Sequence, residues 1–137
     1  MPFDLMIVTP QGPAFEGPAD NVVLPGSEGD FGVLPSHERL LAPLRIGEVE
    51  IRTGSGTIFA AIAGGFAEVD GSEVVVMVES CEAAEDVDVA RAEHARSRAE
   101  KGLAELGADE SAKRIQEFEA ALERAHNRIA VAERAGR

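Results

Sequence analysis

The chain has 137 residues, 45% of them hydrophobic, a length and composition typical of one globular domain or one domain with a small appendage. Its one cysteine excludes an intramolecular disulfide and a multi-cysteine metal site, and there is no run of about 18 apolar residues to predict a membrane-spanning helix. The net charge of −12 lies entirely in residues 1–86, which carry 15 acidic and three basic residues. This negative charge argues against nucleic acid or anionic lipid as a partner of residues 1–86.

The first strand patterns are short and are ended by turn residues. Residues 3–9 predict a strand that the prolines and glycine of 10–13 close, and residues 20–24 predict a second. The stretch 26–37 holds three glycines and two acids, and we interpret it as a turn-rich crossover. Its glycine spacing does not predict a phosphate loop, because Pro35 rather than a helix follows it.

The clearest strand pattern covers residues 46–53, where apolar and charged residues alternate from residue 48 onward. The turn at 54–56 leads into a strand at 57–63, and Gly64-Gly65 indicates a bulge or a close backbone approach. Residues 66–77 predict a hairpin around Asp70-Gly71, since Asp-Gly favours a tight turn. Short strands at this spacing predict an all-β sandwich or barrel over residues 1–86.

From residue 86 the hydrophobic period changes from two to 3.6, and residues 87–137 predict a two-helix hairpin. Asp86 is the predicted N-cap of the first helix, and Asp109 or Ser111 that of the second. Small residues follow helical spacing on the first helix, and a narrow seam of larger ones follows it on the second: Ile115, Phe118, Leu122, Ala125, Ile129 and Ala132. Facing seams of this kind favour an antiparallel hairpin, which is marginal unless it docks on the sandwich or on a partner.

The sequence predicts no catalytic residues and no metal site. His37, His94 and His126 lie in three separate elements without metal-ligand spacing. Glu28 and Asp30 lie in a glycine-rich segment with nothing apolar nearby to raise a pKa, which favours surface or interface carboxylates over an acid–base pair.

Four arginines suggest a binding groove. Arg124 and Arg128 are one turn apart on the second helix, and Arg91 and Arg98 share one face of the first, so a closed hairpin could align four guanidinium groups. Asp88 precedes Arg91 by three residues and could orient it. Such a set suits a polyphosphate, whereas the competing interpretation is a group of solvated arginines paired with nearby glutamates.

Three segments resemble the epsilon subunit of the rotary F-type ATP synthase of bacteria. These are the glycine-rich stretch of residues 23–37, the Gly-Gly strand of residues 62–69 and the acidic linker of residues 82–86. The resemblance implies a sandwich of about ten short strands (residues 1–86) that binds the gamma subunit and the c-ring, followed by a regulatory hairpin (residues 87–137). It implies a non-catalytic central-stalk subunit that helps couple proton translocation to ATP synthesis.

The resemblance also implies a place and a set of partners. The protein is expected at the cytoplasmic face of the bacterial plasma membrane, as a peripheral protein without membrane insertion or nucleic-acid binding. An extended hairpin would contact the alpha and beta catalytic subunits and oppose ATP hydrolysis. The alternative that we retain is a free-standing ATP-sensing module without a rotor partner.

Some bacterial members of this family bind ATP in the folded hairpin through the motif Ile/Leu-Asp-x-x-Arg-Ala. Residues 87–92 match this motif except for valine in the first place. The resemblance therefore implies ATP as a regulatory ligand, with no required cofactor, at the following residues: Glu82, Asp88, Arg91, Ala92, Arg98, Arg124 and Arg128. It also suggests Asp30 and His37 as contacts to the c-ring; for His37 a local loop hydrogen bond is the equal alternative.

Overall fold

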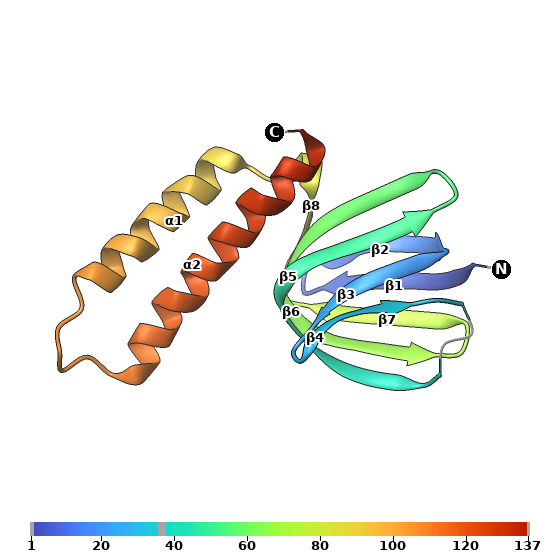
Figure 1. The fold of residues 1–137 in the computed structure, drawn as a ribbon, viewed down its shortest axis with the longest axis horizontal. Helices are drawn as coiled ribbons and strands as arrows, with labels where there is room; N and C mark the ends of the chain where they lie inside the picture. The colour runs from blue at the N-terminus through green and yellow to red at the C-terminus, as the bar shows by residue number, and fades with distance from the viewer. Residues whose placement is uncertain (1, 36–37, 137) are drawn as a thin grey trace.

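A computed structural model describes residues 2–35 and 38–136. Within these residues a strand-rich layer precedes two helices (Figure 1). The elements are, in order, β1 (Phe3–Thr9), β2 (Gly12–Ala19), β3 (Asn21–Gly26), β4 (Gly29–Val33), β5 (Leu40–Thr53), β6 (Gly56–Asp70), β7 (Glu73–Val78), β8 (Cys81–Ala83), the 3-10 turn η1 (Ala84–Asp86), α1 (Val89–Ala104), α2 (Ala112–Ala132) and the 3-10 turn η2 (Glu133–Ala135).

The strands form a sandwich from one continuous sheet in the order β2-β1-β7-β6-β5-β3-β4, with β8 paired to β6. The long hairpin of β5 and β6 bends where it faces the helices, so that its two ends lie on opposite sides of the other strands (Figure 1). The described residues hold eight strands rather than the expected ten or so, because β5 and β6 run 14 and 15 residues without interruption. The sandwich itself confirms the predicted fold class.

Three strands were not predicted: β2, β4 and the short β8. β2 carries Pro13 and Pro18, which argue against a strand in the sheet interior, but β2 lies at the sheet edge, where a missing N–H costs little. The glycine-rich stretch is not a crossover: β3 and β4 form a hairpin in which Gly26 pairs with Gly29 around a two-residue turn. The glycines therefore serve this turn and the tight packing beneath it.

The two glycines in the middle of β6 mark a close backbone approach rather than a bulge. Gly64 and Gly65 have φ angles of +93° and +147°; the register of β6 with β5 is the same on both sides of them, and the pairing of β6 with β7 begins at Gly65. A Cβ on Gly65 would lie 1.9 Å from the Met77 carbonyl oxygen, so only glycine fits there. This close approach lets β6 bend while it stays paired to β7.

The core lies between the two layers of strands and is mainly aliphatic. It contains Phe3, Leu5, Ile7, Ala19, Val22, Leu24, Val33, Leu44, Val49, Ile51, Ile62, Ala67, Val69, Val74, Val76 and Val78, all below 9% exposure. The alternation predicted for β5 is present, since Val49 and Ile51 are buried while Glu48 and Glu50 are partly exposed.

The helices form the predicted antiparallel hairpin, and α2 lies between α1 and the sandwich (Figure 1). Asp88, not Asp86, caps α1, because its side chain accepts a hydrogen bond from the Arg91 backbone N–H at 3.0 Å, whereas Asp86 ends the preceding 3-10 turn. Ser111 caps α2 in the same way at 3.3 Å. Ala92 and Ala99 of α1 are buried, as the small-residue seam predicts.

Candidate functional site

A cavity of about 290 Å³ lies where the sandwich, α1 and α2 meet. It is lined by residues of β8, of α1 with its N-cap, and of α2: Glu82, Asp88, Arg91, Ala92, Ala95, Arg98 and Arg128. Six of the seven residues proposed from the sequence as a nucleotide site thus share one cavity. Ala95 is an addition, and its position three residues after Ala92 on the same helix face is the signal that could have found it.

Helix α1 positions one side of this cavity. Val87, only 1% exposed, anchors the linker in the protein, and the Asp88 cap begins the helix immediately afterwards. Arg91 and Arg98 are two turns apart and therefore project on the same face of α1. Asp88 orients Arg91 by capping the backbone rather than by pairing with the guanidinium group, so that group is left to face the cavity.

Helix α2 contributes one arginine, which ties it to the end of the sandwich. Arg128 donates through Nε to Glu82 Oε1 at 2.7 Å, and both side chains are about one-third exposed. The geometry is that of a charge-assisted hydrogen bond. Because Glu82 belongs to β8, this ion pair joins α2 to the strand from which the linker leaves.

The cavity has the chemistry of an anion site. Three guanidinium groups face two carboxylates, and Glu82 is already engaged by Arg128. Arginine forks match phosphate oxygens in geometry and charge, and the small Ala92 and Ala95 leave space beside them. The charged groups of its lining are three guanidinium groups and the carboxylates of Glu82 and Asp88.

Arg124 is the one residue of the predicted set that is not among those lining the cavity. It lies one turn, about 6 Å, farther along α2 from Arg128 toward the tip of the hairpin. Helical spacing placed the two arginines on one side of α2 but carried no information about how far the cavity extends along the helix. His37 lies outside the described residues.

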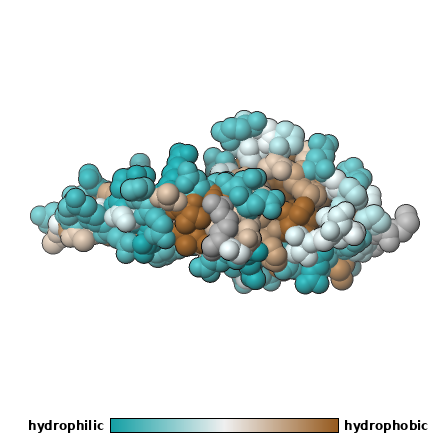
Figure 2. Space-filling model, turned by 90° about the horizontal axis from the view of Figure 1, so that it is seen from above, coloured by the Kyte–Doolittle hydropathy of each residue, from teal (hydrophilic) through white to brown (hydrophobic). Residues whose placement is uncertain are grey.

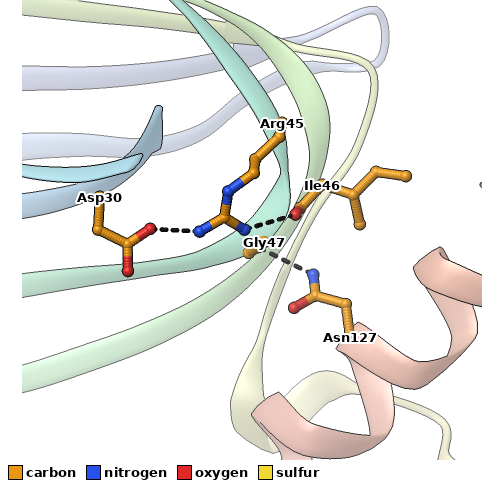
Figure 3. A network of polar contacts seen from close by, with 5 residues as sticks. All are labelled: Asp30, Arg45, Ile46, Gly47 and Asn127. Atoms are coloured by element: carbon orange, nitrogen blue, oxygen red, sulfur yellow. Dashed lines mark hydrogen bonds and ion pairs between the residues drawn. The ribbon is translucent and has the colours of Figure 1, made fainter. Parts of the chain in front are cut away.

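Asp30 occupies a second, more open groove at the sandwich surface next to α2. Its carboxylate pairs with the Arg45 guanidinium, which also donates to the Ile46 carbonyl at 3.1 Å (Figure 3). The Asp30 side chain remains 61% exposed. A surface pair of this kind contributes little stability, so the Asp30 carboxylate can exchange partners.

Asn127 fixes α2 on the sandwich. Its side-chain amide donates to the Gly47 carbonyl at 2.8 Å and to the Ile62 carbonyl at 3.4 Å, as Figure 3 shows for the Gly47 contact. Gly47 is needed here because a Cβ would lie 2.6 Å from the Pro25 Cβ. Sequence reasoning missed Asn127, although a polar residue beside the apolar seam of α2 was a usable signal.

The surface is uneven in polarity. The hairpin is mostly hydrophilic in the view from above, and hydrophobic atoms gather near its junction with the sandwich and over the middle of the sandwich (Figure 2). Several large apolar side chains are exposed on the strands, including Leu41 at 66%, Phe66 at 52% and Met77 at 45%. Pro43, Phe66 and Met77 are direct cross-strand neighbours on β5, β6 and β7.

Cys81 is half-buried against the core. Burial raises the pKa of its thiol from 9.0 to about 11, and the negative charge of the Glu82 carboxylate makes a second, smaller contribution in the same direction. The thiol is therefore protonated at neutral pH. Over residues 2–35 and 38–136 there is no group of three or more metal-binding side chains, and neither helix is long and apolar enough to cross a membrane.

Two family models match the chain, and together they cover nearly all of it. The beta-sandwich domain of the ATP synthase delta/epsilon chain matches residues 2–84, and the long alpha-helix domain of the same chain matches residues 85–133. The ATP synthase epsilon chain of Halalkalibacterium halodurans is 41% identical over 93% of this chain and 95% of its own. That of Syntrophobacter fumaroxidans is 44% identical over 95% of each chain.

Solved structures share the fold. A chain from the Euglena gracilis mitochondrial ATP synthase (OSCP, F1 and c-ring) aligns with a TM-score of 0.77 at 24% identity, over 98% of this chain and 81% of that one. A chain from the Tetrahymena thermophila mitochondrial ATP synthase central stalk and c-ring aligns with a TM-score of 0.66 at 13% identity, over 94% of this chain and 95% of that one. At these identities the likeness concerns the arrangement of strands and helices.

Proposed function

The chain belongs to the delta/epsilon family of ATP synthase, as an epsilon subunit, a non-catalytic subunit of the central stalk, and we propose that it turns with the rotor and helps couple proton translocation to ATP synthesis. The proposal places it peripherally at the cytoplasmic face of the bacterial plasma membrane. Its partners there are the gamma subunit and the c-ring.

Exposed apolar side chains on the sandwich support docking to gamma. Phe66 and Met77 are neighbours on adjacent strands, about half exposed, and Pro43 extends their row. A contiguous apolar surface on a folded domain is the usual mark of a protein–protein interface. The c-ring contact is assigned to the edge that carries Asp30, whose exposed carboxylate can pair with a basic group on a ring loop.

The regulatory part of the proposal is that the cavity binds ATP and that the ligand holds the hairpin folded. The observation that carries it is the convergence of Arg91, Arg98 and Arg128 from two helices onto one cavity. A polyphosphate bound there would bridge α1 and α2 and would be lost if they separated. A ligand that binds only the folded state favours it by its differential affinity.

The same argument assigns a role to the hairpin when it is undocked from the sandwich and extended. Once released, the helices can extend toward the alpha and beta catalytic subunits and oppose ATP hydrolysis. ATP would then favour hydrolysis-competent complexes by retaining the folded hairpin. The inhibition is tested directly by truncation after Asp86, which should raise hydrolysis by the assembled enzyme; unchanged hydrolysis excludes inhibition by this hairpin.

Calorimetric titration of the full chain with ATP tests the cavity. Arg91→Ala and Arg128→Ala should each weaken ATP binding about 10-fold or more, since each removes a charge-assisted contact of about 1.5–3 kcal/mol. Arg114→Ala is the matched control, because Arg114 lies on α2 outside the cavity. Equal affinities in all three variants would refute the site.

The alternative function, a free-standing ATP-sensing module, shares this cavity but not the rotor. Co-purification separates the two. A stable complex with gamma supports the rotor subunit, and a chain that binds ATP but never gamma supports the sensor.

A further inference from the structure

The C-terminal turn makes the most elaborate side-chain contact between the helical part and the sandwich. Arg134 of η2 donates through Nε to Glu48 Oε2 at 3.0 Å and through Nη2 to Glu48 Oε1 at 3.1 Å. Its guanidinium carbon also lies 4.9 Å from the centre of the Phe59 ring, over the ring face. One side chain thus combines a two-pronged ion pair with a cation–π contact.

Beside these contacts the end of α2 packs into a small apolar cluster, the seat, which Ala61 and Ala84 form around Val131. Val131 is fully buried in a small cluster with Ala61 and Ala84, separate from the main core. Phe59 packs against this cluster and carries the Arg134 guanidinium on its ring. Arg134 therefore covers the side chain that helps to enclose Val131.

The seat connects the end of α2 both to the sandwich and to the linker that precedes α1. Ala61 belongs to β6 and Ala84 to the η1 turn, so Val131 touches both the sandwich and the linker from which the helices start. Helix α1 is held in place through α2, because α2 is the helix that packs against the strands. Separation of the hairpin from the sandwich thus requires Val131 to leave this seat.

We propose that the C-terminal turn is a latch, in which Arg134, gripped by Glu48 and stacked on Phe59, keeps Val131 seated and holds the hairpin against the sandwich. Release of Arg134 is the step that frees the end of α2. The latch stands on the contacts alone; its consequence for ATP hydrolysis rests on the proposed function.

The ion pair between Arg134 and Glu48 makes the latch sensitive to salt. Arg134 and Glu48 are 53% and 27% exposed, so the ion pair is partly screened by mobile ions. The hydrogen bond that Arg134 donates to Glu48, and after it the charge of that carboxylate, raise the pKa of Arg134, so the guanidinium stays charged. Higher ionic strength should open the latch without any change in protonation.

Amide hydrogen exchange on the full chain, followed by mass spectrometry, tests the latch. Arg134→Ala should raise exchange in the C-terminal half of α2 about 10-fold, because it removes the ion pair and the ring contact together. Arg134→Lys keeps the charge but loses the fork and the planar stacking, and should raise it about threefold. Adding Glu48→Gln to Arg134→Ala should change exchange less than twofold further, since the partner is already gone.

Arg39→Ala is the matched control. Arg39 forms a comparable exposed ion pair with Asp70 at 2.9 Å, but at the strand ends away from the helices. It should leave exchange in α2 unchanged, and strand amides in every variant report that the sandwich is folded. An Arg134→Ala chain whose α2 exchange stays within twofold of the unsubstituted chain overturns the latch.

Hydrolysis by the assembled complex separates the latch from the proposed function. If α2 exchange rises in Arg134→Ala and hydrolysis falls, both stand. If exchange rises and hydrolysis does not change, the latch stands and the proposed inhibition fails. If exchange does not rise, the latch fails whatever hydrolysis does.

Discussion

Substitution of Gly65 by alanine should destabilise the sandwich strongly, and the structure allows the cost to be worked out. A Cβ at Gly65 would lie 1.9 Å from the Met77 carbonyl oxygen and 2.9 Å from the Val78 Cα, so the backbone of β7 must move by more than 1 Å. That movement weakens two or three ladder hydrogen bonds of about 1 kcal/mol each. The φ angle of +147° adds strain of about 1–2 kcal/mol. The expected loss is about 3–5 kcal/mol.

Gly56→Ala isolates the contribution of the backbone angle. Gly56 has a similar φ of +135°, but its Cβ would meet no atom within 4 Å, so only the strain of about 1–2 kcal/mol applies. Scanning calorimetry suits a chain without tryptophan or tyrosine, and in 137 residues 1 kcal/mol corresponds to roughly 3–4 °C in Tm. Gly65→Ala should therefore melt about 10–17 °C lower than the unsubstituted chain. A difference of less than about 3 °C between the two variants would refute the close approach as the reason for Gly65.

Two further predictions concern Cys81 and Asn127. Because the pKa of the Cys81 thiol is raised to about 11 in the folded chain, its contribution to stability is complete below pH 9 and is lost as the pH rises from 9 to 11. Iodoacetamide at pH 8 should alkylate Cys81 about 100-fold more slowly in the folded chain than in urea, and similar rates would contradict the raised pKa. Asn127→Ala leaves the Gly47 carbonyl without its 2.8 Å donor and should loosen the docking of α2 by about 1–2 kcal/mol. Faster amide exchange confined to the helices would support this role, whereas exchange equal to that of the unsubstituted chain would exclude it.

Local sequence patterns were sufficient to predict those elements whose structure is decided by neighbouring residues. The Asp-Gly pair predicted the hairpin of β6 and β7, although its two turn residues are Gly71 and Ser72 because Asp70 pairs with Glu73. The alternation along β5 predicted that strand through its side-chain period. The seams of α1 and α2 likewise specify two helices that face each other. By contrast β2 was missed, because the same prolines that rule out an interior strand are tolerated at an edge, and edge position is a property of the whole sheet.

For the binding cavity, the sequence alone determined the residue types and their helical faces: Arg91 and Arg98 share a face because two helical turns separate them. The resemblance to a known family added Glu82 and Ala92. Only the tertiary structure decided that Arg128 closes the cavity while Arg124 lies outside it. It alone also brought Arg134 to Glu48 across 86 positions of the chain. The physical reason is that helical periodicity fixes direction around an axis, whereas the distance between elements depends on how the hairpin packs on the sandwich.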